Sequence, residues 1–253
     1  MTKRKPFKLK IPRFFKRKPS GRSPRKGWRK WGIRGIKILF WIMLLLHLYA
    51  LLLRFVPVPG TILMSQRAMS GAEIRKDWTR IKDISPNLVY AVIGAEDSRF
   101  CQHKGVDWEA VKTVMDEREA GVRQRGGSTI TQQTAKNVFL WNGGGWVRKL
   151  PETWAALFID TVWGKSRVME VYLNVAEWGD GIFGAEAAAQ ARFGKPAKNL
   201  TRREAALLAA VLPNPHKWRL DPPGPYVSKR AGQLQVRLAN VQTSGFAKCV
   251  GVG

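Results

Sequence analysis

The sequence predicts a mainly α-helical protein, with one membrane-spanning helix ahead of a single globular domain. Three observations predict this fold class. A continuous apolar run lies near the N-terminus, apolar residues recur at helical spacing after residue 71, and alternating strand patterns are scarce. The chain has 253 residues, 45% of them hydrophobic, which is enough for one domain of ordinary size.

The chain is strongly basic, and its charge is unevenly distributed. It holds 44 Lys and Arg against 18 Asp and Glu, a formal net charge of +26. Residues 1–37 contain 16 of the basic residues and no acid, which leaves 28 basic and 18 acidic residues elsewhere. Because prolines and charges interrupt any apolar face, we predict a disordered basic tail over residues 1–35.

The apolar run predicts a transmembrane anchor over residues 36–57. Its core, Ile38 to Leu53, is apolar except for His47, and its length suits a bilayer. Candidate interfacial anchors are Trp28, Trp31, Trp41 and Tyr49. The preceding positive charge predicts a cytoplasmic N-terminus. A cleaved signal peptide would have a shorter basic region, and a buried core helix would not follow such a tail.

Cys101 and Cys249 follow the predicted anchor, so we expect them in an oxidising compartment. One disulfide and two unpaired thiols are both compatible with the sequence. No CxxC or HExxH spacing occurs and the three histidines are scattered, so we expect no dedicated zinc site.

Helical signals continue through the rest of the chain. Ser85 followed by Pro86 predicts a helix start, with Ser85 as the N-cap. The globular domain is expected over residues 58–230, followed by a C-terminal tail over residues 231–253. Further helices are expected over residues 106–120, 129–139, 152–163, 165–175, 184–192 and 201–211.

Residues 88–105, LVYAVIGAEDSRFCQHKG, contain the first candidate catalytic group. At 100° per residue, the apolar face that holds Glu96 also holds Val89, Val92, Ile93 and Phe100. Desolvation on such a face raises the pKa of a carboxylate and makes it a better proton acceptor. A solvated glutamate at a frayed helix end is the alternative.

Residues 123–140, RQRGGSTITQQTAKNVFL, predict an anion-binding helix. Gly126 and Gly127 provide a flexible entry, and Ser128 is expected to cap a helix whose first amides are free. The long polar side chains of this helix are Gln132, Gln133, Lys136 and Asn137. A solvated face normally includes acids, but none occurs between Gly121 and Glu152, so a sugar-phosphate ligand is favoured.

Two later motifs hold clustered charges. In VRKLPETW, Arg148 and Lys149 precede Glu152, which we place in the first turn of a helix whose dipole keeps it ionised. The cluster is either a local ion pair or an arrangement of cations, or of a divalent metal, around a phosphate. In GKSRVMEVYLN, a structural role is favoured for Lys165, Arg167, Glu170, Tyr172 and Asn174.

Together these motifs resemble the peptidoglycan glycosyltransferases, the lysozyme-like enzymes that polymerise lipid II. The likeness covers about residues 70–225 and includes the closing EAALLAAVLPNP. The chain leaves no room for a transpeptidase domain, so it resembles the monofunctional, membrane-anchored branch. The matching residues are Glu96, Asp97, Phe100, His103, Gly105, Gly127, Ser128, Thr129, Ile130, Thr131, Gln132, Gln133, Lys136, Asn137, Arg148, Lys149, Glu152, Lys165, Glu170, Tyr172, Leu173 and Asn174.

The resemblance implies a two-lobed glycosyltransferase domain that inverts the anomeric carbon of a polyprenyl-pyrophosphate-linked glycan. The 4-hydroxyl of lipid II attacks, and a β-1,4 bond forms. Glu96 and Glu152 are the implied catalytic carboxylates, with Mg²⁺ or Mn²⁺ at Glu152 as the expected cofactor and no organic cofactor. The implied substrate-binding residues are Asp97, Phe100, His103, Gly105, Ser128, Thr129, Gln132, Gln133, Lys136, Asn137, Arg148 and Lys149.

The resemblance also implies a place in the bacterial inner membrane, with the catalytic domain in the periplasm. Expected partners are lipid II, the growing glycan chain, the membrane, and proteins of cell-wall synthesis or division, but not nucleic acid. Many relatives carry arginine where this chain has Gly144, which leaves its donor affinity open. An apolar jaw between residues 106 and 145 is expected to enter the membrane, with core packing as the alternative. Its candidate contacts are Phe139, Leu140, Trp141 and Trp146.

Two rival hypotheses remain at this point. A lytic enzyme of the same shape would need an acid opposite the base, and Glu152 among cations is a poor acid. A non-enzymatic membrane scaffold would bind nucleic acid or an acidic polymer through residues 1–35.

Overall fold

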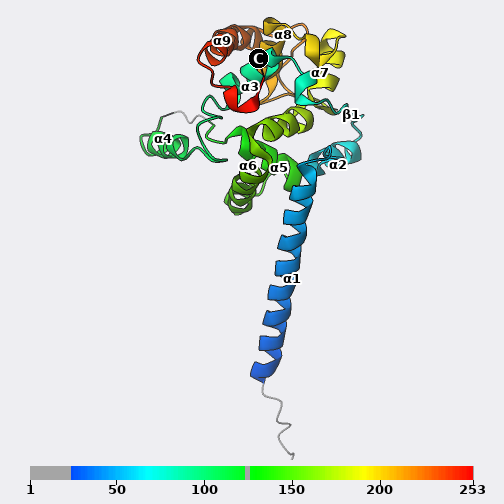
Figure 1. Ribbon diagram of the computed structural model, residues 1–253, viewed down its shortest axis with the longest axis vertical. Helices are drawn as coiled ribbons and strands as arrows, with labels where there is room; N and C mark the ends of the chain where they lie inside the picture. The colour runs from blue at the N-terminus through cyan, green and yellow to red at the C-terminus, as the bar shows by residue number, and fades with distance from the viewer. Residues whose placement is uncertain (1–23, 123–125, 253) are drawn as a thin grey trace, which may run out of the picture. The chain divides into compact units, whose positions relative to one another are not determined.

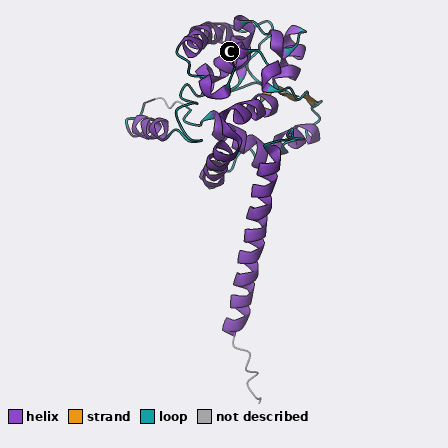
Figure 2. Cartoon of the chain, viewed as in Figure 1, coloured by secondary structure: helices purple, strands orange, loops and turns teal. Residues whose placement is uncertain are grey.

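The computed structural model describes residues 24–122 and 126–252 (Figure 1). Most of the predicted basic tail, and residues 123–125 of the second motif, lie outside this part of the chain. The described residues are mainly helical, with short strands (Figure 2), which confirms the predicted fold class. The chain divides within its first helix into two units, residues 1–47 and residues 48–253.

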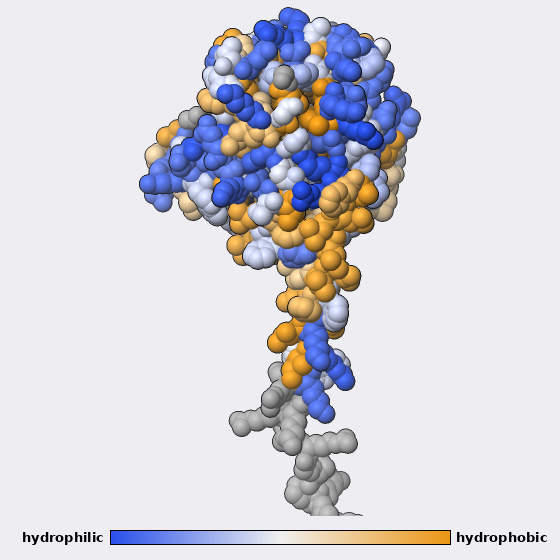
Figure 3. Space-filling model, viewed as in Figure 1, coloured by the Kyte–Doolittle hydropathy of each residue, from blue (hydrophilic) through white to orange (hydrophobic). Residues whose placement is uncertain are grey.

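The first helix, α1 (Pro24–Leu53), contains the predicted anchor. Its stretch Lys30–Leu53 is, among the described residues, the one helix long and apolar enough to cross a membrane. Apolar side chains cover most of its length, and basic ones gather toward its N-terminal end (Figure 3). Trp31 and Trp41 are exposed, as interfacial anchors would be, whereas the side chain of Trp28 lies outside the described part.

The anchor ends earlier than the predicted residue 57, because the last turn of α1 belongs to the folded unit. Ala50 and Leu53 are buried there. The indole nitrogen of Trp163 donates to the carbonyl of Ala50 at 2.7 Å, and Arg167 donates to that of Leu53 at 2.7 Å. These bonds satisfy carbonyls that the helix end leaves without partners.

The second unit consists of helices, short 3₁₀ turns and one small sheet. The strands β1 (Arg75–Lys76), β2 (Glu177–Gly179) and β3 (Ile182–Phe183) lie in the order β1-β3-β2, with β1 parallel and β2 antiparallel to β3. The 3₁₀ turns are η1 (Ile81–Asp83), η2 (Ala197–Asn199) and η3 (Lys248–Val250). The α-helices are α2 (Ile62–Met69), α3 (Pro86–Glu96), α4 (Trp108–Glu119), α5 (Ile130–Phe139), α6 (Gly145–Val175), α7 (Ala185–Phe193), α8 (Arg202–Val211) and α9 (Pro225–Thr243).

The helices predicted from periodicity are confirmed, with one difference. Within α6, Gly164 has φ 72° and separates two helical segments, as expected over residues 152–163 and 165–175, but the first segment begins at Gly145 instead of residue 152. Ser85 occupies the predicted N-cap position of α3, but its hydroxyl donates to the carbonyl of Leu200 instead of capping the helix.

The helices pack in two groups within this unit, and α3 lies at the centre of one of them. It contacts α8 and α9, while α5 lies along α6 (Figure 1). The alanines of α8 are buried, and their small side chains allow close approach. Gly94 on α3 serves the same purpose, since a Cβ there would lie 3.1 Å from the Cβ of Arg237 on α9.

Residues 231–253, predicted to be a tail, instead belong to the folded unit. Most of α9 lies in this segment, and its buried residues Ala231, Leu234, Leu238 and Val241 face the core. Their spacing of three and four residues is helical, but the basic and amide residues between them obscured it in the sequence. The boundary predicted at residue 230 is therefore wrong.

A disulfide joins Cys101, in the loop after α3, to Cys249 in η3, across 148 residues of sequence. Of the two alternatives that the sequence left open, one disulfide or two unpaired thiols, the structure shows the disulfide. Phe100, beside Cys101, is fully buried. The C-terminal segment is thereby tied directly to the loop that follows Glu96.

Candidate active site

Glu96 is the last residue of α3, and its side chain is half-buried. Its Oε2 accepts a hydrogen bond of 2.9 Å from the side-chain nitrogen of Gln133 on α5. Burial raises the pKa of Glu96; the Gln133 bond and the charge of Arg230 lower it, Asp97 raises it, and Lys136 lowers it. The pKa is raised on balance, which is the property predicted for a proton acceptor on an apolar face.

Helix α5 begins at a well-formed cap, although not at the predicted residue. Thr129, and not Ser128, is the N-cap, and its hydroxyl accepts from the amide of Gln132. The side-chain oxygen of Gln132 accepts in return from the amide of Thr129 at 3.1 Å. This capping box keeps Gln132 buried and gives it a structural role at the start of α5, while the contact with substrate predicted for it stays a prediction.

Asp97 connects α3 to α5. Its buried carboxylate accepts from the amide of Ile130, at the start of α5, at 3.0 Å. It also accepts from Nε2 of His103 at 3.0 Å. A carboxylate at a helix N-terminus is stabilised by free amides and by the helix dipole. Asp97 therefore sets the position of α5, and with it Gln133, relative to Glu96.

Phe100, His103 and Gly105 belong to the loop between α3 and α4, and they do not line either of the two cavities next to Glu96. The His103 ring packs edge-on against Phe100, with ring centroids 6.3 Å apart. Gly105 has φ +80°, and a Cβ there would lie 2.8 Å from the carbonyl oxygen of Ala156. These three residues pack around Asp97 and α6, and the contacts with substrate predicted for them stay a prediction.

Glu152 lies at the centre of a buried cluster of charges. Its side chain is 3% exposed, Lys149 Nζ lies 2.5 Å from its Oε1, and Arg148 pairs with its Oε2. Lys149 also donates to the hydroxyl of Ser128 at 2.9 Å. Because α6 begins at Gly145, Glu152 is not in the first turn, and its charge is balanced by these cations and not by the helix end.

Lys136 links this cluster to Glu96. Burial lowers the pKa of Lys136, as do the charges of Arg148 and Lys149, while Glu152 and Glu96 raise it. Lys136 thus lies within electrostatic range of both predicted catalytic carboxylates. The structure therefore brings the two carboxylates and the three predicted cations into one site.

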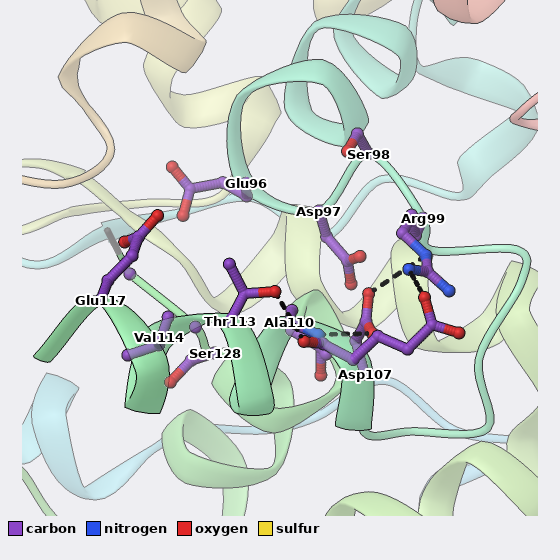
Figure 4. A pocket seen from close by; sticks show the side chains of 14 residues that line it. Glu96, Asp97, Ser98, Arg99, Asp107, Ala110, Thr113, Val114, Glu117 and Ser128 are labelled. Carbon is purple, nitrogen blue, oxygen red and sulfur yellow. Dashed lines mark hydrogen bonds and ion pairs between the residues drawn. The ribbon is translucent and has the colours of Figure 1, made fainter. Parts of the chain in front are cut away.

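Two cavities adjoin this site. The first, of about 340 Å³, is lined by Glu96, Asp97, Ser128, Thr129 and one side of α4. Figure 4 shows Glu96 and Glu117 at one end of this group of lining residues, and Arg99 paired with Asp107 at the other end. Nine of the 14 residues that line this cavity carry a hydroxyl or a carboxylate, groups that can bind the hydroxyls of a sugar.

The second cavity, of about 280 Å³, is lined by later residues of α5 and by the loop after α8. Gln133, Lys136 and Asn137 face it from α5, opposite Arg67 and His216. Arg67 is paired with Glu177, which also lines this cavity, whereas Lys136 supplies a positive charge that suits an anionic group such as a phosphate. The hydrogen bond between Gln133 and Glu96 therefore joins residues that line different cavities.

The donor groups at Glu152 do not fit a divalent cation. Both of its oxygens are bound by Lys149 and Arg148, whose charges would repel a metal ion. Mg²⁺ requires several oxygen ligands with space for water. Among the described residues, the one group of three ligand-type side chains within reach of each other is Glu177, Asp180 and His216, which does not include Glu152.

Arg230 on α9 is a site residue that sequence reasoning missed. Its positive charge lowers the pKa of Glu96, and its guanidinium lies 5.9 Å from the ring centre of Trp218. Within the described residues its buried Nε has no hydrogen-bond partner. Arg230 belongs to no motif recognised in the sequence and lies 134 positions from Glu96, so no local pattern pointed to it.

Gly144 is the N-cap of α6 and has φ 79°. A Cβ there would lie 3.1 Å from the indole nitrogen of Trp141 and 3.2 Å from the Cβ of Arg148. This left-handed turn favours glycine. Arg148 donates to the neighbouring carbonyl of Gly143 at 2.6 Å, so the turn also orients a cation of the cluster.

Comparison with known proteins adds independent findings. The model of the family described as transglycosylase matches residues 63–237. The chain is 51% identical over 214 residues to the biosynthetic peptidoglycan transglycosylase of Rhodospirillum centenum, covering 84% of this chain and 93% of the relative. It is 49% identical to that of Caulobacter vibrioides (79% and 87% covered) and 44% identical to that of Pseudomonas aeruginosa (81% and 91% covered).

Proposed function

Since this chain belongs to the transglycosylase family and is a peptidoglycan transglycosylase, we propose that it polymerises lipid II by inverting glycosyl transfer. The donor is a glycan linked to polyprenyl pyrophosphate, and the acceptor is the 4-hydroxyl of lipid II. One observation carries the proposal: a half-buried carboxylate with a raised pKa lies in the field of a buried cluster of cations. We further propose that the chain has no transpeptidase activity.

Glu96 is the proposed general base. As the acceptor oxygen forms its bond to the donor's anomeric carbon, the hydroxyl proton passes to the Glu96 carboxylate. The raised pKa of Glu96 brings its proton affinity closer to that of the attacking hydroxyl. Gln133 holds the carboxylate in place through its 2.9 Å bond.

Negative charge develops on the opposite side of the anomeric carbon, where the bond to pyrophosphate breaks. Lys136, Arg148 and Lys149 are the proposed stabilising cations, with Glu152 orienting the last two. Because these groups are already positioned, they stabilise the leaving charge without reorganisation. Pyrophosphate leaves as an anion, so the site needs no acid to protonate it.

Substrate contacts are assigned to the two cavities. Ser128, Thr129 and Asp97 line the first cavity beside Glu96, where we place sugar hydroxyls. Gln133, Lys136 and Asn137 line the second, where we place a phosphate-bearing part of a substrate.

We propose a single-pass protein of the inner membrane, with α1 as anchor, a cytoplasmic N-terminus and a periplasmic domain. Trp141 and Trp146 are exposed, as the proposed membrane jaw requires. The jaw also extends beyond residue 145, because Val147 and Leu150 on α6 are about 80% exposed. Phe139 instead packs between Tyr49 and Trp163, with ring centroids 6.3 Å and 6.0 Å away, so it belongs to the core. Leu140 is half-buried.

Family membership overturns the hypothesis of a non-enzymatic scaffold. The remaining rival, a lytic enzyme, is tested by incubating the purified full-length protein with lipid II in detergent. We expect long glycan strands, and no shortening of strands supplied preformed. Cleavage of preformed strands without any new polymer would contradict the proposal.

A cation of the cluster can be tested separately. We expect Lys149→Met to lower kcat for polymerisation by roughly 10²-fold, because one preorganised charge is lost from the leaving-group side. The matched control is Lys82→Met, since Lys82 is exposed on η1. An unchanged kcat in the Lys149 variant would remove it from the proposed mechanism.

A further inference from the structure

We propose that Tyr172 is a positioning residue, which acts on Glu96 through the orientation of the Gln133 side-chain amide. This inference rests on the proposed function, because it assumes that Glu96 must be ionised to act. Tyr172 itself is not expected to touch the reacting atoms.

Three side chains from three helices form a continuous hydrogen-bonded chain. Tyr172 on α6 is 1% exposed, and its hydroxyl donates to Oε1 of Gln133 on α5 at 3.3 Å. Nε2 of the same amide donates to Oε2 of Glu96, at the end of α3, at 2.9 Å. The two ends of one amide are therefore engaged by two different partners.

The direction of this chain follows from what each group can donate. An ionised carboxylate only accepts hydrogen bonds, so the amide nitrogen must face Glu96. The amide oxygen then faces Tyr172, whose hydroxyl must donate. Burial, together with the charges of Glu96 and Asp97, raises the pKa of Tyr172 well above its ordinary value, so the phenol keeps its proton. The reversed amide would turn its oxygen toward the carboxylate, which is repulsive.

The charged groups that act on Glu96 come from several elements. Asp97 follows it in the same turn, Lys136 lies on α5 and Arg230 on α9. Tyr172 faces it from α6. None of these charges selects between the two orientations of a neutral amide by direct contact. The Glu96 carboxylate favours the amide nitrogen on its side, and the hydrogen bond that the Tyr172 hydroxyl donates to the amide oxygen reinforces the same orientation.

Removing the hydroxyl takes away the hydrogen bond that Tyr172 donates to the amide oxygen of Gln133. Gln133 and Tyr172 both line the second cavity, so the amide can turn into that space. The bond from Nε2 to Glu96, which favours the ionised form, is then weakened. The pKa of Glu96 should rise further, and less of the base should be ionised at a given pH.

The test compares Tyr172→Phe with wild type in lipid II polymerisation across pH. We expect the acid limb of the kcat/KM profile to move to higher pH. The loss should be about two- to tenfold on that limb, the range of one hydrogen bond, and should disappear at higher pH. The matched control is Tyr90→Phe, because Tyr90 is also buried and its hydroxyl donates to the carbonyl of Val252. It should leave the profile unchanged.

A second readout does not depend on activity. The pKa of Glu96 can be read from its carboxyl carbon resonance in glutamate-labelled protein, assigned by its loss in Glu96→Gln. We expect Tyr172→Phe to raise this pKa in the wild-type background but not in Gln133→Leu, where the connecting amide is absent. An equal rise in both backgrounds would show that Tyr172 does not act through Gln133.

If Tyr172→Phe fails to fold, 3-fluorotyrosine at position 172 decides the question. This residue keeps the shape of tyrosine but is a stronger donor, so the pKa of Glu96 should fall. No change in the pKa of Glu96 would overturn the inference.

Failure of the inference can be told apart from failure of the proposed function, because a wild-type protein that makes no strands refutes the function. Wild type that makes strands, with superimposable Tyr172→Phe and wild-type profiles, refutes only the role of Tyr172.

Discussion

Glu96→Gln abolishes detectable strand formation, an expected loss of at least about 10²- to 10⁴-fold in kcat. Gln has nearly the same shape as Glu and can still accept a hydrogen bond from Gln133, so the fold and the local contacts are retained. What the variant loses is the ability to take the proton of the acceptor hydroxyl. The measurement is the yield and length of glycan strands made from lipid II.

The matched control is Glu73→Gln, because Glu73 is exposed and its ion pair with Arg75 lies at the surface. It should polymerise like wild type. Strand formation persisting in Glu96→Gln would refute the assignment of the base.

The raised pKa of Glu96 also predicts how activity depends on pH. The base acts when ionised, so activity falls as pH falls through its raised pKa. The acid limb should therefore lie above the range expected for an ordinary glutamate, and wild-type kcat/KM measured against pH checks this. An acid limb at the ordinary value would mean that Glu96 is solvated during turnover.

The stability of the folded protein should depend on pH in the opposite sense to its activity. A carboxylate whose pKa is raised by folding stabilises the protein below its unfolded-state pKa. That contribution is lost as pH rises through the folded-state pKa. Glu96→Gln lacks this loss, so it should melt a few degrees higher than wild type at neutral pH, with a smaller difference in acid.

Loss of the disulfide between Cys101 and Cys249 should lower the free energy of unfolding by about 5 kcal/mol. This figure is the loop-closure entropy expected for the 148-residue separation. The bond also fastens η3 to the loop that carries Phe100, so its loss releases two elements of the core. Denaturant unfolding of the full-length protein in detergent, with and without reductant, measures the effect.

The sequence provides a clean control for this experiment. It contains two cysteines, so a reductant can act on this disulfide alone. A Cys101→Ser, Cys249→Ser double variant should match the reduced wild type and should not respond to reductant. Equal unfolding midpoints for oxidised and reduced wild type would show that the bond contributes little to stability.

Much of the site could be predicted from the spacing of apolar and charged residues within short stretches of the sequence. The apolar face of α3 placed Glu96 on a buried stripe, and the absence of acids around α5 indicated an anionic ligand. Both signals depend on residues within a few positions of each other, which helical periodicity relates directly. The same local reasoning could not tell that Gln132 turns inward to cap α5 while Gln133 turns toward Glu96.

The predictions from sequence were wrong where segments far apart in the chain pack against each other. The start of α6 was placed seven residues late, because Pro151 resembles a first-turn residue. The segment after residue 230 was predicted as a tail, although 11 of its 23 residues are apolar. Its helix forms where α3 and α8 offer a surface to bury them. Arg230 was missed for the same reason.

Helix positions, the apolar anchor and the family motifs were thus specified by local order in the chain, since caps and turns involve neighbours. Only the packed structure decided that Cys101 meets Cys249, that both oxygens of Glu152 are taken by cations, and that Tyr172 reaches Gln133. These contacts depend on the angles and distances at which separate helices pack. Those quantities are set by the complementary shape of buried side chains over the whole domain, which no short stretch of sequence contains.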